Sequence, residues 1–110
     1  MKIRGGALLA RAFAEKGITH VFTLSGGFCN PALEGFADCG MTVINAPHEQ
    51  VAGHLADGTT RITRNPAICL VGPEGFANAI PAMMEAWGER SPVIFVTGSS
   101  TLKRQGSGGF

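Results

Sequence analysis

Glu49 is the residue whose type and position could most directly do chemistry. It stands between His48 and Gln50, after a strand-like apolar segment and at the predicted start of a helix. The dipole of a helix favours an ionised carboxylate in the first turn. Such a carboxylate could share a proton with a bound ligand, or it could serve only as a helix cap. Residue type alone leaves both interpretations open.

Glycine-rich turns follow three other strand-like segments. These turns are Ser25-Gly26-Gly27, next to Phe28; Gly72-Pro73-Glu74-Gly75, close to Asn78; and Gly98-Ser99. Because glycine has no side chain, a flat ring or a substrate could approach the backbone at such turns. The alternatives are that these segments are plain strand-to-helix turns and that Asn78 is solvated or caps a helix. The spacing is not Gly-x-Gly-x-x-Gly, so it is weak evidence for dinucleotide binding.

Alternating helical and strand-like patterns surround these turns and predict an α/β fold with a parallel sheet. Right-handed crossovers give the strand order 2-1-3-4 between two layers of helices, a three-layer α/β/α arrangement. Parallel sheets bind ligands beyond the carboxyl ends of their strands, so Glu49 and the glycine-rich turns should share one rim. Helices are predicted over residues 7–16, 30–38, 48–63 and 76–89, and strands over 20–24, 41–46, 67–71 and 92–97.

Individual residues indicate where these helices end and how deeply the strands are buried. Gly17 and Gly40 stand where helices end, and Asn30 is predicted to cap the second helix, whose first turn holds Pro31. The apolar runs 67–71 and 93–96 are typical of strands buried on both faces. Residues Met83, Met84, Ala86 and Trp87 fall on one helix and predict core or subunit interface.

Composition indicates one small soluble domain of 110 residues, with 45% hydrophobic residues, 15% charged residues and a net charge of +1. No basic cluster could neutralise phosphates, so nucleic acid and anionic membranes are not expected partners. No apolar segment approaches the ~18 residues of a membrane span. The three cysteines, Cys29, Cys39 and Cys69, lack metal-site spacing and predict small buried side chains in a reducing compartment. We therefore expect a cytoplasmic protein.

The segment from His48 to Gly58 resembles the thiamine-diphosphate enzyme family, whose pyrimidine domain carries His-Glu-x-x-Ala-x-x-x-Ala-(Asp/Glu)-Gly here. Further similarities follow in order and in register, at residues 17–22, Gly26, residues 75–79 and residues 91–98. They extend along essentially the whole chain. The sequence is therefore similar to the N-terminal pyrimidine domain of enzymes of the acetolactate synthase and benzaldehyde lyase type.

This resemblance implies a role for Glu49. The matching glutamate of the family hydrogen-bonds a ring nitrogen of the cofactor's aminopyrimidine and promotes the tautomer that removes the thiazolium C2 proton. The resemblance also implies cofactor contacts at Gly26, Gly75 and Asn78, and substrate contacts at Ser25, Gly27, Phe28, His48 and Phe110.

The implied activity is that of a carbon-carbon lyase, a decarboxylase or an acetolactate synthase-like transferase acting on 2-oxo acids or related carbonyl compounds. Magnesium and the cofactor diphosphate would be held by a diphosphate-binding domain absent from these 110 residues. In a homo-oligomer that domain belongs to a second subunit. A flavin is an optional further cofactor.

Three departures from the family pattern leave the substrate open and predict a divergent branch. Pro47 replaces the usual Arg, Ser25 the usual Pro, and Pro73-Glu74-Gly75 the usual Gly-Pro-Gly. A non-catalytic remnant or assembly module of the same fold is the alternative function, and a flavodoxin-like binder of a flavin or nucleotide is a third. The chain is also expected to stop inside its domain, before the last strands. The fourth strand would then be an uncharged apolar edge that favours self-association.

Overall fold

The computed structural model describes residues 2–108 of the chain. Its centre is a four-stranded sheet in the order β2-β1-β3-β4, with every pair of neighbouring strands parallel. This confirms the predicted topology. The strands are β1 (His20–Leu24), β2 (Thr42–Asn45), β3 (Ala67–Val71) and β4 (Val93–Thr97).

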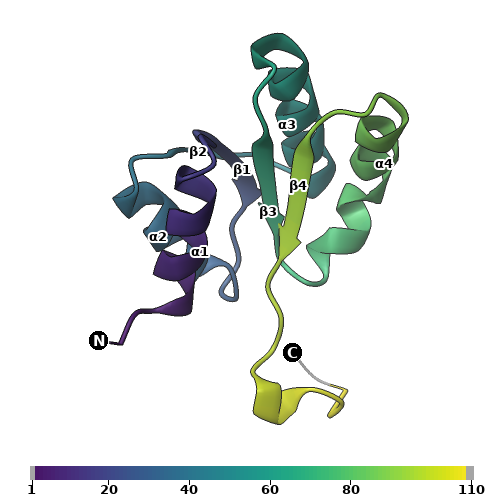
Figure 1. Cartoon of the computed structure of the whole chain (residues 1–110). Coiled ribbons are helices and arrows are strands. Elements are labelled where there is room, and N and C mark those ends of the chain that lie inside the picture. The colour runs from purple at the N-terminus through teal and green to yellow at the C-terminus, as the bar shows by residue number, and fades with distance from the viewer. Residues whose placement is uncertain (1, 109–110) are drawn as a thin grey trace.

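Two pairs of helices cover the two faces of the sheet (Figure 1). The α1–α2 pair lies on one face and the α3–α4 pair on the other, which confirms three layers. After β4 the chain leaves the sheet and forms a short 3₁₀ helix, η1. The helices are α1 (Gly5–Ala14), α2 (Asn30–Asp38), α3 (Glu49–Thr63), α4 (Gly75–Gly88) and η1 (Leu102–Arg104).

The sheet separates two clusters of buried apolar side chains, and its inner strand β3 contributes to both. Successive side chains of a strand point to opposite faces. Ile68 and Leu70 therefore join the cluster under α1 and α2, whereas Cys69 and Val71 join the cluster under α3 and α4. All five residues of β3 are buried, as the apolar run predicts.

β4 is an edge strand, as the predicted strand order requires, but it is less buried than its apolar sequence predicts. Residues Val93 to Val96 are only partly buried, and Thr97 is exposed. The reason is position: β4 has a strand partner, β3, on one side only, so its other edge and the neighbouring side chains stay open. Cys39 also departs from expectation, because it is exposed whereas Cys29 and Cys69 are buried.

The helix ends follow the sequence signals with two corrections. The first helix, predicted over residues 7–16, is Gly5–Ala14, and its C-cap is Glu15 rather than Gly17. Gly17 and Gly40 both have a left-handed φ of 76°, which glycine adopts without the strain of a Cβ. Asn30 is not the cap of α2 but its first residue, and Cys29 is the N-cap, without a side-chain cap hydrogen bond. The Cys29 carbonyl accepts the Ala32 and Leu33 N–H groups, so the chain already turns before Asn30.

Small residues let the helices of each pair approach closely. A Cβ on Gly35 of α2 would lie 2.5 Å from the Gly6 carbonyl oxygen of α1. A Cβ on Gly53 of α3 would lie 2.5 Å from the Cβ of Ala82 on α4. Gly53 weakens α3 as an isolated helix, but its lack of a side chain permits the α3–α4 packing. Among residues 2–108, no helix has the length and apolar character needed to cross a membrane.

Candidate site at the carboxyl rim of the sheet

Glu49 and Gly75 begin two neighbouring helices at the same rim. The loop after β2 leads into α3, which starts at Glu49, and the loop after β3 leads into α4, which starts at Gly75. Because α3 packs along α4, the starts of the two helices lie next to each other. The Glu49 side chain is only 14% exposed.

The Glu49 carboxyl group is held against α4. The Asn78 Nδ2 donates a hydrogen bond to Glu49 Oε2 over 3.2 Å. A Cβ on Gly75 would overlap Glu49 Oε1 and lie 2.7 Å from Glu49 Cγ. The absence of a side chain at Gly75 is therefore what leaves room for the carboxyl group.

His48 takes the capping role that the sequence left open for Glu49. Its Nδ1 accepts the Gln50 backbone N–H over 3.1 Å, and His48 is the N-cap of α3. An Nδ1 that accepts a hydrogen bond carries no proton, so the ring proton is on Nε2. The Nδ1 is 4.0 Å from Glu49 Oε2, which is too far for a hydrogen bond. Because His48 caps α3, the Glu49 carboxyl group is free to interact with groups outside its own helix.

The turn after β1 is open. The Ser25 N–H donates to Asn45 Oδ1 over 3.4 Å. A Cβ on Gly26 or Gly27 would meet no atom within 4 Å, and neither residue has a positive φ. The fold itself therefore does not require glycine at these two positions, and the space beside them is available to a ligand.

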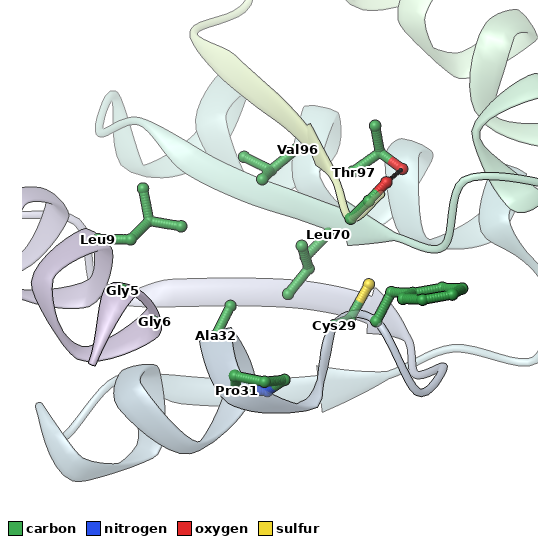
Figure 2. Close-up of a pocket in the computed structure, with 11 residues that line it drawn as sticks. Gly5, Gly6, Leu9, Cys29, Pro31, Ala32, Leu70, Val96 and Thr97 are labelled. Carbon is green, nitrogen blue, oxygen red and sulfur yellow. Dashed lines mark hydrogen bonds between the residues drawn. The ribbon is translucent and has the colours of Figure 1, made fainter. Parts of the chain in front are cut away.

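Phe28 lines a hollow of about 220 Å³ between α1, the start of α2 and the end of β4 (Figure 2). The hollow is lined mainly by apolar groups. The buried Cys29 thiol donates to the Val71 carbonyl over 3.2 Å, and burial raises the pKa of this thiol. Cys29 is therefore protonated at neutral pH and is not a reactive nucleophile.

The structure thus brings His48, Glu49, Gly75 and Asn78 together, whereas Phe28 lines a hollow that none of these four residues lines. Phe110, the remaining predicted substrate contact, lies outside the described residues. Within residues 2–108, no three side chains of His, Cys, Asp or Glu gather as a metal-binding group would.

Sequence reasoning missed an ion-pair cluster that joins α3 to α4. Arg61 binds both Asp57 oxygens, at 3.0 Å from Nε and 2.7 Å from Nη2. The same Nη2 is 3.2 Å from Glu85 Oε1, and Nη1 is 3.8 Å from Glu89 Oε2. The hydrogen bonds from Arg61 hold the pKa of the buried Asp57 carboxyl below its ordinary value. The i,i+4 spacing of Asp57 and Arg61 was the available signal.

The comparison with protein families agrees with this architecture. Residues 3–110 match the family model described as "Thiamine pyrophosphate enzyme, N-terminal TPP binding domain". The chain belongs to this family. Thiamine pyrophosphate is another name for thiamine diphosphate, so the resemblance inferred from the sequence is confirmed.

Individual thiamine pyrophosphate enzymes show the same relationship. A probable acetolactate synthase of Mycobacterium bovis is 35% identical over 107 residues, covering 96% of this chain and 20% of that protein. A sulfoacetaldehyde acetyltransferase of Castellaniella defragrans is 33% identical over 107 residues, covering 92% of this chain and 18% of that protein.

Among solved structures, the thiamine diphosphate-dependent 4-hydroxybenzoylformate decarboxylase of Rhodococcus jostii RHA1 superposes with a TM-score of 0.84 at 23% identity. The match covers 96% of this chain and 20% of that chain, and it confirms the fold. This chain therefore spans about a fifth of the length of these relatives.

Proposed function

We propose that this chain is the pyrimidine-binding part of a thiamine-diphosphate-dependent enzyme that acts on 2-oxo acids or related carbonyl compounds. The reaction class is that of a carbon-carbon lyase, a decarboxylase or an acetolactate synthase-like transferase. The relatives named acetolactate synthase and sulfoacetaldehyde acetyltransferase support this class. When bound, thiamine diphosphate supplies the electron sink for a carbanion next to a former carbonyl carbon.

The observation that carries the proposal is the placement of the Glu49 carboxyl group. It is largely shielded from solvent, hydrogen-bonded to Asn78 and held over Gly75. The carboxyl group can hydrogen-bond a ring nitrogen, and the open space beside Gly26 and Gly27 could receive a flat heteroaromatic ring, so the residues fit an aminopyrimidine. Glu49 would share its carboxyl proton with the ring nitrogen, while Gly26, Gly75 and Asn78 would border the ring. Ser25, Gly27 and His48 would face the substrate.

The proposed partner is the diphosphate-binding domain of a second subunit, which would hold the diphosphate and magnesium. Support comes from apolar side chains exposed on α4 at helical spacing. Ile80 is 47% exposed, Met84 is 65% exposed and Trp87 is 83% exposed. A row of this kind marks a protein–protein contact surface more often than an ordinary solvated face.

The test is Glu49→Gln in the cofactor-loaded enzyme that contains this chain. Glutamine keeps the shape of Glu49 but has no carboxyl proton to share, so C2 hydrogen–deuterium exchange of bound cofactor should slow by orders of magnitude. Glu74→Gln, an exposed glutamate at the same rim, is the matched control and should leave the exchange rate unchanged. If Glu49→Gln exchanges as fast as the wild type, Glu49 does not activate the cofactor and the proposal is wrong.

A further inference from the structure

The two carboxyl oxygens of Glu49 have different surroundings. Oε2 accepts the hydrogen bond from Asn78 Nδ2 and is 4.0 Å from His48 Nδ1. Oε1 lies so close to Gly75 that a Cβ there would overlap it. Within residues 2–108, no donor forms a hydrogen bond with Oε1 that would match the one at Oε2.

Helix geometry explains why one helix makes both contacts. Gly75 and Asn78 are three residues apart in the first turn of α4, so they lie on the same face of the helix. That face meets the start of α3, where Glu49 is. The bare backbone at Gly75 and the amide of Asn78 therefore approach the carboxyl group together.

We propose that Asn78 is a positioning residue that determines which oxygen of Glu49 exchanges the proton. This inference rests on the proposed role of Glu49. The Asn78 Nδ2 can only donate, so it keeps Oε2 as an acceptor. The proton of the neutral carboxyl group is then on Oε1, beside Gly75. If that proton moved to the ring nitrogen of a bound aminopyrimidine, the Asn78 N–H would stabilise the negative charge left on Glu49.

A double-mutant cycle tests this role, because two residues that act as a unit have non-additive effects. Asn78→Ala should slow C2 exchange of the cofactor-loaded enzyme by about tenfold, the cost of one hydrogen bond to a charged group. Asn78→Asp keeps the shape but loses the donor, and it should slow exchange at least as much. In the Glu49→Gln background, Asn78→Ala should change the rate by less than about twofold.

Other outcomes distinguish the positioning role of Asn78 from the proposed function of the chain. If Glu49→Gln slows C2 exchange but Asn78→Ala does not, the positioning role is wrong and the proposed function stands. The role is also wrong if Asn78→Ala slows exchange equally in both backgrounds, because Asn78 would then act independently of Glu49. If Glu49→Gln itself has no effect, the proposed function fails.

A second measurement needs no cofactor. In the NMR spectrum of the 110-residue chain, the Asn78 side-chain amide protons should shift upfield and exchange faster in Glu49→Ala. The side-chain amide of Asn65, an exposed asparagine after α3, is the internal control and should not change. Unchanged Asn78 signals would show that the hydrogen bond is not formed and would overturn the inference.

Discussion

At the residue scale, two neighbouring side chains at the start of α3 have different roles. His48 caps α3 through its Nδ1, so Glu49 does not need to fold back onto its own backbone. Its carboxyl group instead crosses to α4, where it meets Asn78, 29 residues further along the chain. The strand–loop–helix pattern predicted the rim position of Glu49. It could not predict the bond to Asn78, because that bond depends on how two helices pack.

Gly75→Ala should damage the site, whereas Gly88→Ala in the same helix should not. Alanine favours a helix over glycine by about 1 kcal/mol, and a Cβ on Gly88 meets no atom within 4 Å. A Cβ on Gly75 would overlap the Glu49 carboxyl group, and such overpacking costs about 1–3 kcal/mol. Urea unfolding should therefore show Gly75→Ala less stable than Gly88→Ala. Equal stabilities would mean that Glu49 moves aside freely.

At the element scale, the strand boundaries and order followed from local sequence, but the contacts between helices did not. β1 and β3 have the predicted bounds, because each apolar run stands between turn-forming residues. The strand order followed from the handedness of the crossovers. By contrast, the packing role of Gly53 in α3 cannot be seen in the local sequence, because it depends on Ala82 of α4. The predicted strand order placed β4 at an edge of the sheet, but how far its side chains are exposed depends on which neighbours are present.

Arg61→Met should loosen the α3–α4 pair by leaving the Asp57 carboxylate, only 6% exposed, without its partner. Arg11→Met is the matched control, because Arg11 is exposed on α1 and no ion pair for it is found within residues 2–108. At neutral pH, Arg61→Met should have a clearly lower urea midpoint than Arg11→Met. If the midpoints are equal, the cluster does not hold the helices together.

The pH dependence of this stability has a definite sign. The folded-state pKa of Asp57 lies below its ordinary value of 3.8 because of the Arg61 hydrogen bonds. The unfolded chain therefore binds the proton more readily, and stability rises with pH through this window. The contribution is fully present above about pH 3.8 and is lost as the pH falls through the folded pKa. The difference between wild type and Arg61→Met should shrink in acid urea titrations.

At the scale of the whole molecule, the proposed function assigns this chain only one side of a cofactor site. In that proposal Glu49, Gly75 and Asn78 border the ring, whereas the described residues contain no cluster of metal ligands for a magnesium–diphosphate group. The chain also spans about a fifth of the length of its relatives. Most of the binding energy for the cofactor should therefore come from elsewhere in the enzyme.

Calorimetry of the 110-residue chain with thiamine diphosphate and magnesium should accordingly show weak binding. We expect no affinity tighter than about millimolar, ~4 kcal/mol, because the diphosphate and metal supply most of the anchoring. The matched comparison is the longer enzyme containing this chain, which should bind far more tightly. Micromolar binding by the 110 residues would mean that the diphosphate site lies within this chain.

The exposed apolar surface around β4 and α4 should make the 110-residue chain self-associate. β4 has one strand partner and no charged residue. Beside it is a hollow of about 110 Å³ whose lining includes Trp87, Val93 and Phe95. An open strand edge next to exposed apolar side chains favours pairing with a second copy.

Sedimentation at high concentration should therefore show dimers or larger species. Trp87→Glu should shift the chain toward the monomer, because it places a charge at the edge of this surface. Ile62→Glu is the matched control, since Ile62 is 85% exposed near the end of α3 and does not line the hollow. It should leave the association unchanged. Backbone amides of β4 should exchange more slowly in the associated species than in the Trp87→Glu variant, because a second copy would cover the free edge. A stable wild-type monomer whose β4 amides are already protected, with fast exchange confined to the Gly/Ser-rich segment after β4, would contradict association through this edge.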